Sequence, residues 1–400
     1  MQKEEAYMNT VREFCKAAQI QSEYNRKLVS ADEAVKVVKS GDRIHYGLFC
    51  GIVRELDKAL AKRTDELEDV LVMDTIWNYP EPPAILQADP EAKHFKYLST
   101  HMSGLDRKMN KQGCCWFVPV QFRENPKYMA ENVGPINVAM FQVGPMDEYG
   151  NFNFGPQLAE YWGIMKAAEK VIVEVNPAQP KVHGIENTIN ISQIDMIVEA
   201  PATPLPSIVA KDATDIEKKI ATHIVDKIES GSTLQLGIGG MPNYVGKMIA
   251  ESDINDLSVH TEMFVDAYVE LYKQGKITGN KNTNKGKMVF TFAMGSQEVY
   301  DFLDDNPMGF MAPVDYVNAV EVIAANDKAV SINSCLQVDL FGQVNSESDG
   351  LQHIGGTGGQ LDFVMGSFQS KGGKSFLCTP SVRKYKDGSV RSLILPTLPE

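Results

Sequence analysis

Residues 232–266 read STLQLGIGGMPNYVGKMIAESDINDLSVHTEMFVD, and this stretch contains the pattern that decides the fold. A short apolar run over 233–236 precedes a glycine loop over 237–243, an apolar helix pattern and a second apolar run that ends before Glu262. A strand, a glycine loop, a helix and a strand in this order are typical of an α/β protein that binds a ligand at the loop. Glu262 has no Ser–His or Cys–His relay near it, so we predict that its own carboxylate is the reactive group.

The same plan occurs in both halves of the chain. An amphipathic helix pattern, a Ser-Gly turn, a short apolar strand and a glycine occupy 31–47 and again 220–237. A second helix pattern, a polar turn and another strand follow over 56–72 and 245–259. Apolar residues alternate between periods of about 3.6 and 2, as α/β units require. We therefore predict two similar open α/β domains with largely parallel sheets and an active site in the cleft between them.

The chain length and one proline-rich segment predict the domain boundaries. Four hundred residues exceed what a single core usually spans. Residues 199–207 read EAPATPLPS, and proline disfavours helix, so the boundary is expected there. We predict an N-terminal helical extension over 1–25, a first domain over 26–205 and a second domain over 206–400 that carries Glu262.

Composition and charge exclude several classes of protein. A net charge of -13 argues against nucleic-acid or anionic-membrane binding as a main role. No apolar run reaches the roughly 20 residues that span a bilayer, and the start MQKEE is not a secretory signal, so a cytoplasmic protein is expected. The cysteines lack metal-ligand spacing, so no metal site and only reduced thiols are predicted. A homo-oligomer, most commonly a dimer, is also expected. The cysteines are Cys15, Cys50, Cys114, Cys115, Cys335 and Cys378.

The glycine loop half-matches a dinucleotide fingerprint. Pro242 stands where the third glycine is required, and Asp256 precedes the next strand instead of ending it. A dinucleotide-dependent oxidoreductase stays an alternative that rests only on Gly237 and Gly239. The glycines also allow the N–H groups of the loop to hold a phosphate or an oxyanion, and a purely structural glycine turn is a further alternative.

Two further glycine clusters are candidates for the walls of the site. Residues 355–359 precede an apolar stretch over 361–364, which favours a tight loop that lines a site and leads into a strand, although a flexible surface loop would have the same composition. Residues 144–155 follow a buried strand pattern in the first half. We expect this segment to face the cleft and carry the acceptor pocket, although a plain turn would give the same pattern.

Three segments in combination resemble the family I coenzyme A transferases, in the acetyl-CoA hydrolase/transferase branch. They are GIGGMPN at 237–243, HTEM at 260–263 and GTGGQLDF at 356–363. The segments HMSG at 101–104 and MFQVGPMD at 140–147 resemble the butyryl-CoA:acetate enzymes of gut anaerobes, with the 4-hydroxybutyrate enzymes as near relatives. The resemblance extends from about Tyr24 to the end of the chain. Family members usually continue for several tens of residues past a segment like 393–399.

The resemblance implies a reaction and a set of site residues. Glu262 matches the catalytic glutamate, which would carry CoA from butyryl-CoA to acetate in a ping-pong reaction through a glutamyl-CoA thioester. CoA would be substrate and covalent intermediate, with no prosthetic group and no metal. The alternatives are an acyl-CoA hydrolase that uses water as acceptor, a 4-hydroxybutyrate CoA-transferase and a non-catalytic CoA-binding protein. The implied CoA-binding residues are Gly239, Gly240, Met241, Pro242, Asn243, Leu336 and Gly359.

Overall fold

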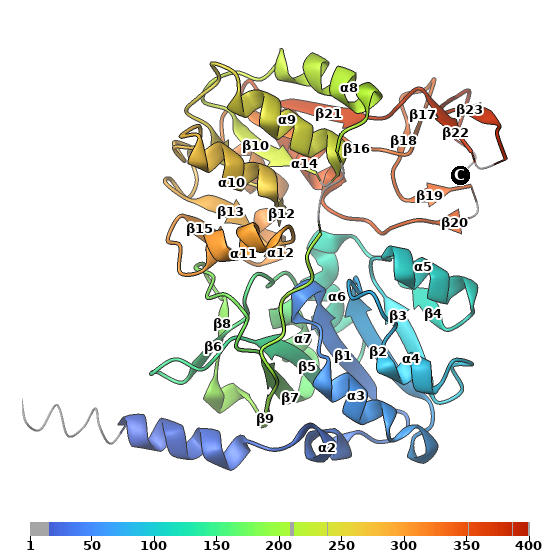
Figure 1. Cartoon of the computed structure of the whole chain (residues 1–400), viewed down its shortest axis with the longest axis vertical. Coiled ribbons are helices and arrows are strands. Elements are labelled where there is room, and N and C mark those ends of the chain that lie inside the picture. The colour runs from blue at the N-terminus through green and yellow to red at the C-terminus, as the bar shows by residue number, and fades with distance from the viewer. Residues whose placement is uncertain (1–15, 209–211, 238, 351, 386, 399–400) are drawn as a thin grey trace, which may run out of the picture.

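The computed structural model describes residues 16–208, 212–237, 239–350, 352–385 and 387–398. It contains two α/β parts, each built around a parallel sheet (Figure 1). The predicted fold class is confirmed. Residues 1–15 of the predicted N-terminal extension lie outside the described residues, and residues 16–27 form a helix at the base of the first part (Figure 1). The Tyr24 ring of this helix stacks on Phe152, with 6.2 Å between the ring centroids.

The first part contains a seven-stranded sheet in the order β4-β3-β2-β1-β5-β7-β9, parallel throughout. Its strands are apolar on both faces because helices cover both sides. In the long central strand β5 (Ile136–Val143), Val138 and Met140 belong to one apolar cluster and Phe141 and Val143 to the other. A separate antiparallel ribbon pairs β6 (Asn151–Asn153) with β8 (Thr188–Asn190). The other strands of the sheet are β1 (Arg43–Leu48), β2 (Val70–Thr75), β3 (Phe95–Ser99), β4 (Cys115–Phe117), β7 (Ala168–Val175) and β9 (Met196–Glu199).

Short helices cover both faces of this sheet. α5 (Gly104–Lys111) begins with a capping box in which Ser103 and Asp106 bond each other's backbone. On one face, α2 (Ala31–Ala34), α3 (Glu55–Ala61) and α4 (Ala84–Ala88) bury Ala34, Leu56 and Ile85. α6 (Asn125–Glu131) and α7 (Tyr161–Ala167) contribute to the other face. The 3-10 turns are η1 (Val35–Val37), η2 (Phe49–Gly51), η3 (Thr64–Glu66), η4 (Phe122–Glu124) and η5 (Ile191–Gln193).

The second part contains a four-stranded parallel sheet in the order β11-β10-β16-β21. Two parallel pairs, β12-β14 and β13-β15, lie beside it. The strands of the sheet are β10 (Thr233–Leu236), β11 (Ser258–Val259), β16 (Ala329–Ser334) and β21 (Lys374–Cys378), and those of the pairs are β12 (Met263–Phe264), β13 (Met288–Phe290), β14 (Phe292–Ala293) and β15 (Gly309–Met311). The helices are α8 (Asp215–Val225), α9 (Gly240–Ala250), α10 (Asp266–Lys273), α11 (Gln297–Leu303), α12 (Val314–Val317), α13 (Val320–Ala324) and α14 (Gln360–Gln369).

Short strands form an outer lobe of the second part, beside α5 and β4 of the first (Figure 1). They pair in small ribbons that are mostly antiparallel. These strands are β17 (Gln337–Asp339), β18 (Val344–Asn345), β19 (Ser348–Asp349), β20 (Gln352–His353), β22 (Val382–Lys384), β23 (Val390–Ser392) and β24 (Ile394–Leu395).

The two halves repeat the same pairing, as the sequence predicts. β1 pairs with β2 in parallel, with Ile44 opposite Val72, and β10 pairs with β11 in parallel, with Leu234 opposite Val259. One prediction is wrong: residues 361–364 lie in helix α14 and not in a strand. Phe363 and Ser367 are buried four residues apart, which is the spacing of one helix face. Residues 200–208 contain neither helix nor strand, and the domain boundary there stays a prediction.

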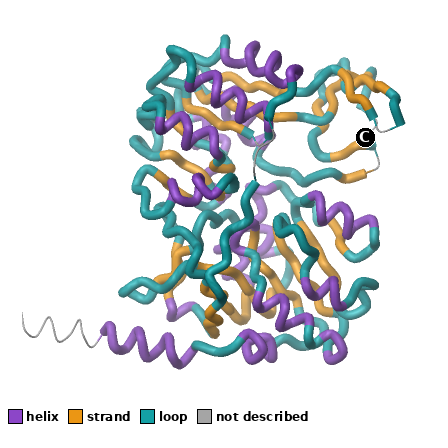
Figure 2. The backbone as a smooth tube through the Cα atoms, in the orientation of Figure 1, coloured by secondary structure: helices purple, strands orange, loops and turns teal. Residues whose placement is uncertain are grey.

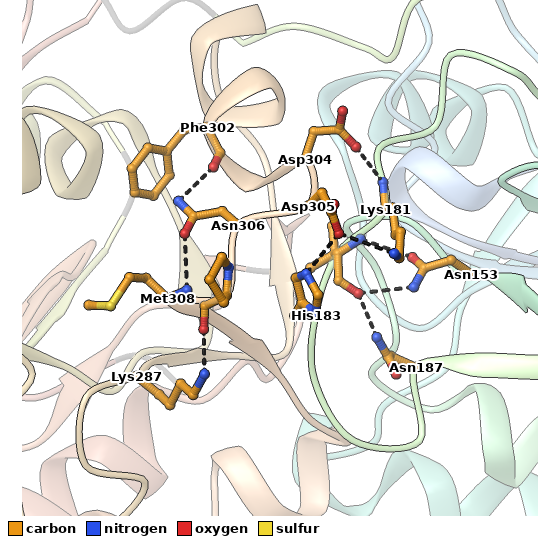
Figure 3. Close-up of polar contacts among 12 residues, drawn as sticks. Asn153, Lys181, His183, Asn187, Lys287, Phe302, Asp304, Asp305, Asn306 and Met308 are labelled. Carbon is orange, nitrogen blue, oxygen red and sulfur yellow. Dashed lines mark hydrogen bonds and ion pairs between the residues drawn. The ribbon is translucent and has the colours of Figure 1, made fainter.

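Loop segments run through the junction between the two parts (Figure 2). Lys181 and His183 of the first part contact Asp304 and Asp305 of the second, as Figure 3 shows. One apolar cluster also includes residues of both parts. No helix within the described ranges has both the length and the apolar character needed to cross a membrane. The cysteines at 50, 114, 115, 335 and 378 are buried free thiols, and Cys15 lies outside the described residues.

Candidate active site

A cavity of about 320 Å³ lies where the two parts meet, and Glu262 lines it. The carboxyl ends of parallel strands from both sheets point into it, which is where open α/β sheets bind ligands. From the first part, residues at or just after the ends of β1 and β2 reach the cavity; from the second part, those at the ends of β10 and β16 do so. The residues of the first part that line it are Phe49, Thr75, Ile76, His101 and Phe122.

Glu262 lies between β11 and β12 and lines this cavity with a half-buried side chain. Its Oε2 accepts a hydrogen bond of 2.6 Å from Nδ2 of Asn318. Burial, and in addition the charge of Asp362, raise the pKa of Glu262 to about 7, although the bonds from Asn318 and the Gly359 N–H oppose the rise. The carboxylate is therefore available at neutral pH and is held by two donors.

Gly359 approaches Glu262 too closely for any other residue. A Cβ at this position would lie 2.4 Å from Oε2 of Glu262 and 2.5 Å from Nδ2 of Asn318. Gly359 is the N-cap of α14, so its N–H belongs to the positive end of a ten-residue helix. The backbone angle φ is -81°, so close approach and not a left-handed conformation requires glycine here. The loop over 355–359 thus lines the cavity, with the N-terminus of a helix facing the carboxylate.

The first part holds this glycine loop in place. The Met102 N–H donates to the Gly355 carbonyl at 3.1 Å, and the Phe122 N–H donates to the Thr357 carbonyl at 3.0 Å. The His101 ring packs directly under Gly356, where an added Cβ would lie 2.8 Å from Nδ1. Burial lowers the pKa of His101 to about 4, so the ring is neutral at pH 7.

Aromatic side chains from both parts form the apolar wall. The rings of Phe49 and Phe292 stack with 3.8 Å between their centroids, and Phe122 meets Phe49 edge-on at 6.3 Å. Phe49 and Ile76 have φ values of 47° and 59°, which is unusual for bulky and β-branched residues. Strained backbone of this kind clusters at functional sites. Residues of both parts therefore build the wall across the junction.

The predicted CoA-binding residues divide into two sets. Gly359 meets Glu262 in the cavity, whereas Gly239 is the N-cap of α9 with φ of 113°, and Gly240, Met241, Pro242 and Asn243 form its first turn. Pro242 fits there because the N–H groups of a first turn need no partner within the helix. Leu336 donates its N–H to Asn345 at 2.8 Å. Of the described residues in the loop over 237–243, only Gly237 lines the cavity, and Leu336 does not; Ile238 lies outside the described residues.

The segment that was expected to carry the acceptor pocket does not line the cavity. Residues 144–155, all described, do not line this cavity, because they lie beyond the ends of β5 and around β6. Residues at or just after the ends of β1, β2 and β3 line the cavity instead. Asn318 and the three phenylalanines were not predicted as site residues, since they occur outside any glycine motif. His101 was quoted only as part of the HMSG segment and was given no role in the site. Among the described residues, no cluster of His, Cys, Asp or Glu is suited to hold a metal ion.

Comparison with known proteins identifies the family of this chain. The N-terminal domain model of the acetyl-CoA hydrolase/transferase family matches residues 12–209, and its C-terminal domain model matches 295–400. A butyryl-CoA:acetate CoA-transferase of Anaerostipes caccae is 48% identical over 379 residues, which cover 94% of this chain and 84% of the relative. A 4-hydroxybutyrate coenzyme A transferase of Clostridium kluyveri is 38% identical over 359 residues, covering 90% and 82%.

A solved structure has the same fold over nearly the whole chain. RipA from Yersinia pestis superposes with a TM-score of 0.87 at 36% identity, covering 95% of this chain and 87% of RipA. The fold and these matches define an enzyme of the CoA-transferase class. The chain belongs to the acetyl-CoA hydrolase/transferase family.

Proposed function

We propose that this enzyme transfers CoA from butyryl-CoA to acetate through a thioester on Glu262. The observation that carries the proposal is a carboxylate held by Asn318 and Gly359 at the mouth of a small aromatic-walled cavity. The relative from Anaerostipes caccae, named for this reaction, supports the choice of substrates.

The reaction proceeds through two kinds of covalent intermediate, a mixed anhydride and a thioester. A carboxylate oxygen of Glu262 attacks the acyl carbon of butyryl-CoA, and the carbon–sulfur bond breaks to give a mixed anhydride and CoA thiolate. The thiolate attacks the glutamyl carbonyl carbon, whose bond to the bridging oxygen breaks, and butyrate leaves. Acetate then attacks the glutamyl-CoA thioester and the same two steps run in reverse. One carboxylate enters and one leaves, so the net reaction consumes no proton.

The two donors around Glu262 suit the oxyanions that form at the glutamyl carbon. The CoA thiolate attacks the glutamyl carbon in one step, and acetate displaces it from the same carbon in a later step. In both steps negative charge develops on a Glu262 oxygen, where the Asn318 amide and the Gly359 N–H already point. One such donor is worth roughly 2.7–4 kcal/mol in other enzymes. These donors are fixed by α12 and α14 before substrate arrives, so little reorganisation is required.

The cavity suits a short unbranched acyl chain and limits the access of water. Phe49, Phe122 and Phe292 form an apolar wall beside Glu262, and the Thr75 hydroxyl is a polar group within it. Exclusion of water protects an anhydride or thioester from hydrolysis. One methylene changes binding by only about 1–3 kcal/mol, so neighbouring chain lengths are expected to be accepted with graded rates.

An exchange assay tests the proposed function. Purified protein is incubated with butyryl-CoA, with or without acetate, and acetyl-CoA and free CoA are measured. We expect acetyl-CoA to form only with acetate and little free CoA to appear without it. Release of free CoA at the same rate in both mixtures would identify a hydrolase instead. Matched assays with acetyl-CoA and other short carboxylates rank the acceptors.

A further inference from the structure

Three consecutive residues of the first part contact the segment that carries Gly359. Gln121 Nε2 donates to Oδ1 of Asp362 at 2.8 Å, and the Phe122 N–H donates to the Thr357 carbonyl at 3.0 Å. Arg123 Nε lies 3.6 Å from the same Oδ1 of Asp362. These contacts cross the junction between the two parts, and we refer to residues 121–123 as the clamp.

Asp362 depends on the clamp for its partners. Its side chain is 1% exposed, and its Oδ2 has no hydrogen-bond partner among the described residues. A buried carboxylate is costly unless it is paired. The third position of α14 stabilises a negative charge through the positive end of the helix, and the clamp provides the side-chain donor and the guanidinium. Opening of the junction would leave this carboxylate without either group.

The clamp holds the chain on both sides of Gly359. Thr357 lies two residues before it and Asp362 three residues after it, within the first turn of a rigid helix. The space between Gly359 and Glu262 is so small that a Cβ would lie 2.4 Å from Oε2. Misplacement by about 1 Å can reduce an enzymatic rate by about 100-fold. The position of the Gly359 N–H is therefore set by contacts from the opposite part.

We propose that residues 121–123 are a positioning clamp, which places the Gly359 N–H on Glu262 only when the two parts are closed. The proposal rests on the proposed CoA transfer and adds residues that the motifs do not contain. Phe122 also lines the cavity, so the clamp closes the apolar wall in the same movement that completes the donor pair. A closed junction thus combines a formed oxyanion site with exclusion of water.

The test is a double-mutant cycle on Gln121 and Asp362. We expect Gln121→Ala to lower kcat for CoA transfer about 10-fold or more while KM for butyryl-CoA changes by less than about 3-fold. Free CoA release without acetate should rise relative to transfer. Asp362→Ala should cause a similar loss of kcat. The double variant should be no less active than the more impaired of the two single variants. If Asp362→Ala does not fold, Asp362→Asn replaces it in the cycle.

A matched control removes a different contact between the two parts. Asp305 of the second part pairs with Lys181 at 3.1 Å and with His183 at 3.0 Å, far along the chain from the glycine loop (Figure 3). Asp305→Ala should leave kcat and the ratio of hydrolysis to transfer within about 2-fold of wild type, because an exposed pair contributes little.

Three results would overturn the clamp. They are an unchanged kcat in Gln121→Ala, purely additive losses in the cycle, and an equal loss in Asp305→Ala, which would indicate general loosening of the junction. Wild-type protein and Glu262→Gln are assayed beside these variants. If wild type transfers CoA and Gln121→Ala matches it, only the clamp fails; if wild type transfers none, the proposed function fails and the clamp falls with it.

Discussion

Nδ2 of Asn318 lies 2.6 Å from Oε2 of Glu262, although 56 residues separate them in the chain. Asn318 caps the end of α12, and Glu262 lies between two strands of the same part. The bond fixes one carboxylate oxygen and lowers the pKa of Glu262 against the rise caused by burial. In the proposed mechanism, the same amide holds the negative charge that develops on this oxygen during transfer.

Removal of the Asn318 amide should therefore slow the chemistry. We expect Asn318→Ala to lower kcat/KM for butyryl-CoA by roughly 100- to 1,000-fold, the usual loss for one oxyanion donor. Circular dichroism and thermal unfolding check that the variant is folded. Activity within a few-fold of wild type would show that this bond has no part in the reaction.

An added methyl group at Gly359 should abolish transfer without unfolding the protein. In Gly359→Ala the new Cβ would meet both Glu262 and Asn318 below 3 Å, so the carboxylate must move out of place. Gly104→Ala is the matched control, since its Cβ would have only an ordinary contact of 3.6 Å with Arg107. CoA exchange is measured for both variants, and full activity of Gly359→Ala would refute the tight geometry.

The pH dependence follows from the ionisation of Glu262. Burial raises its pKa to about 7, and only the carboxylate is a nucleophile, so kcat/KM should fall as the pH drops through about 7. The charge of Asp362 also raises this pKa. Asp362→Asn should therefore move the acidic limb to lower pH, whatever its absolute rate, and Asn318→Ala should move it to higher pH. A limb that stays fixed in both variants would assign the titration to another group.

The stacked pair Phe49 and Phe292 should limit acyl chain length. Phe292→Leu enlarges the cavity beside Glu262, so the rate with hexanoyl-CoA relative to butyryl-CoA should rise by about 10-fold. Phe302→Leu is the control, because Phe302 stacks on Phe264 at 5.9 Å and does not line the cavity. Equal donor profiles for the two variants would place the acyl chain elsewhere.

Glu160 should make stability depend on pH. It is fully buried behind the cavity, where Thr75 bonds its Oε1 at 2.6 Å, and burial raises its pKa from 4.5 to about 7. The unfolded chain loses this proton near pH 4.5 and the folded chain near 7, so the carboxyl destabilises the fold increasingly as the pH rises between these values. Glu160→Gln has no group that titrates at this position. Its free energy of unfolding relative to that of wild type should therefore rise by about 3 kcal/mol from pH 4.5 to 8. Denaturant unfolding at both pH values measures the difference in the free energy of unfolding between the variant and wild type. The same difference at both pH values would show that Glu160 is ionised throughout this range in the folded protein.

Local patterns predict the paired α/β units well, because the strands β1, β2, β10 and β11 follow apolar periodicity and Ser-Gly turns. The same patterns place a glycine loop and Glu262 near each other. Asn318 and Phe122 could not be found in this way, since only tertiary packing brings them to the cavity. The segment after Gly359 was expected to be a strand, because four residues are too few for their apolar pattern to distinguish a strand from a helix. Only the burial of side chains in the folded protein identifies the helix.

Trapping of the intermediate tests the central claim most directly. Wild-type protein is incubated with butyryl-CoA, treated with borohydride or hydroxylamine, digested and analysed by peptide mass spectrometry. The account predicts a single modified side chain, Glu262, in wild type and none in Glu262→Gln, which should also lack CoA exchange. An unmodified Glu262 in protein that exchanges CoA, or exchange by Glu262→Gln, would contradict it.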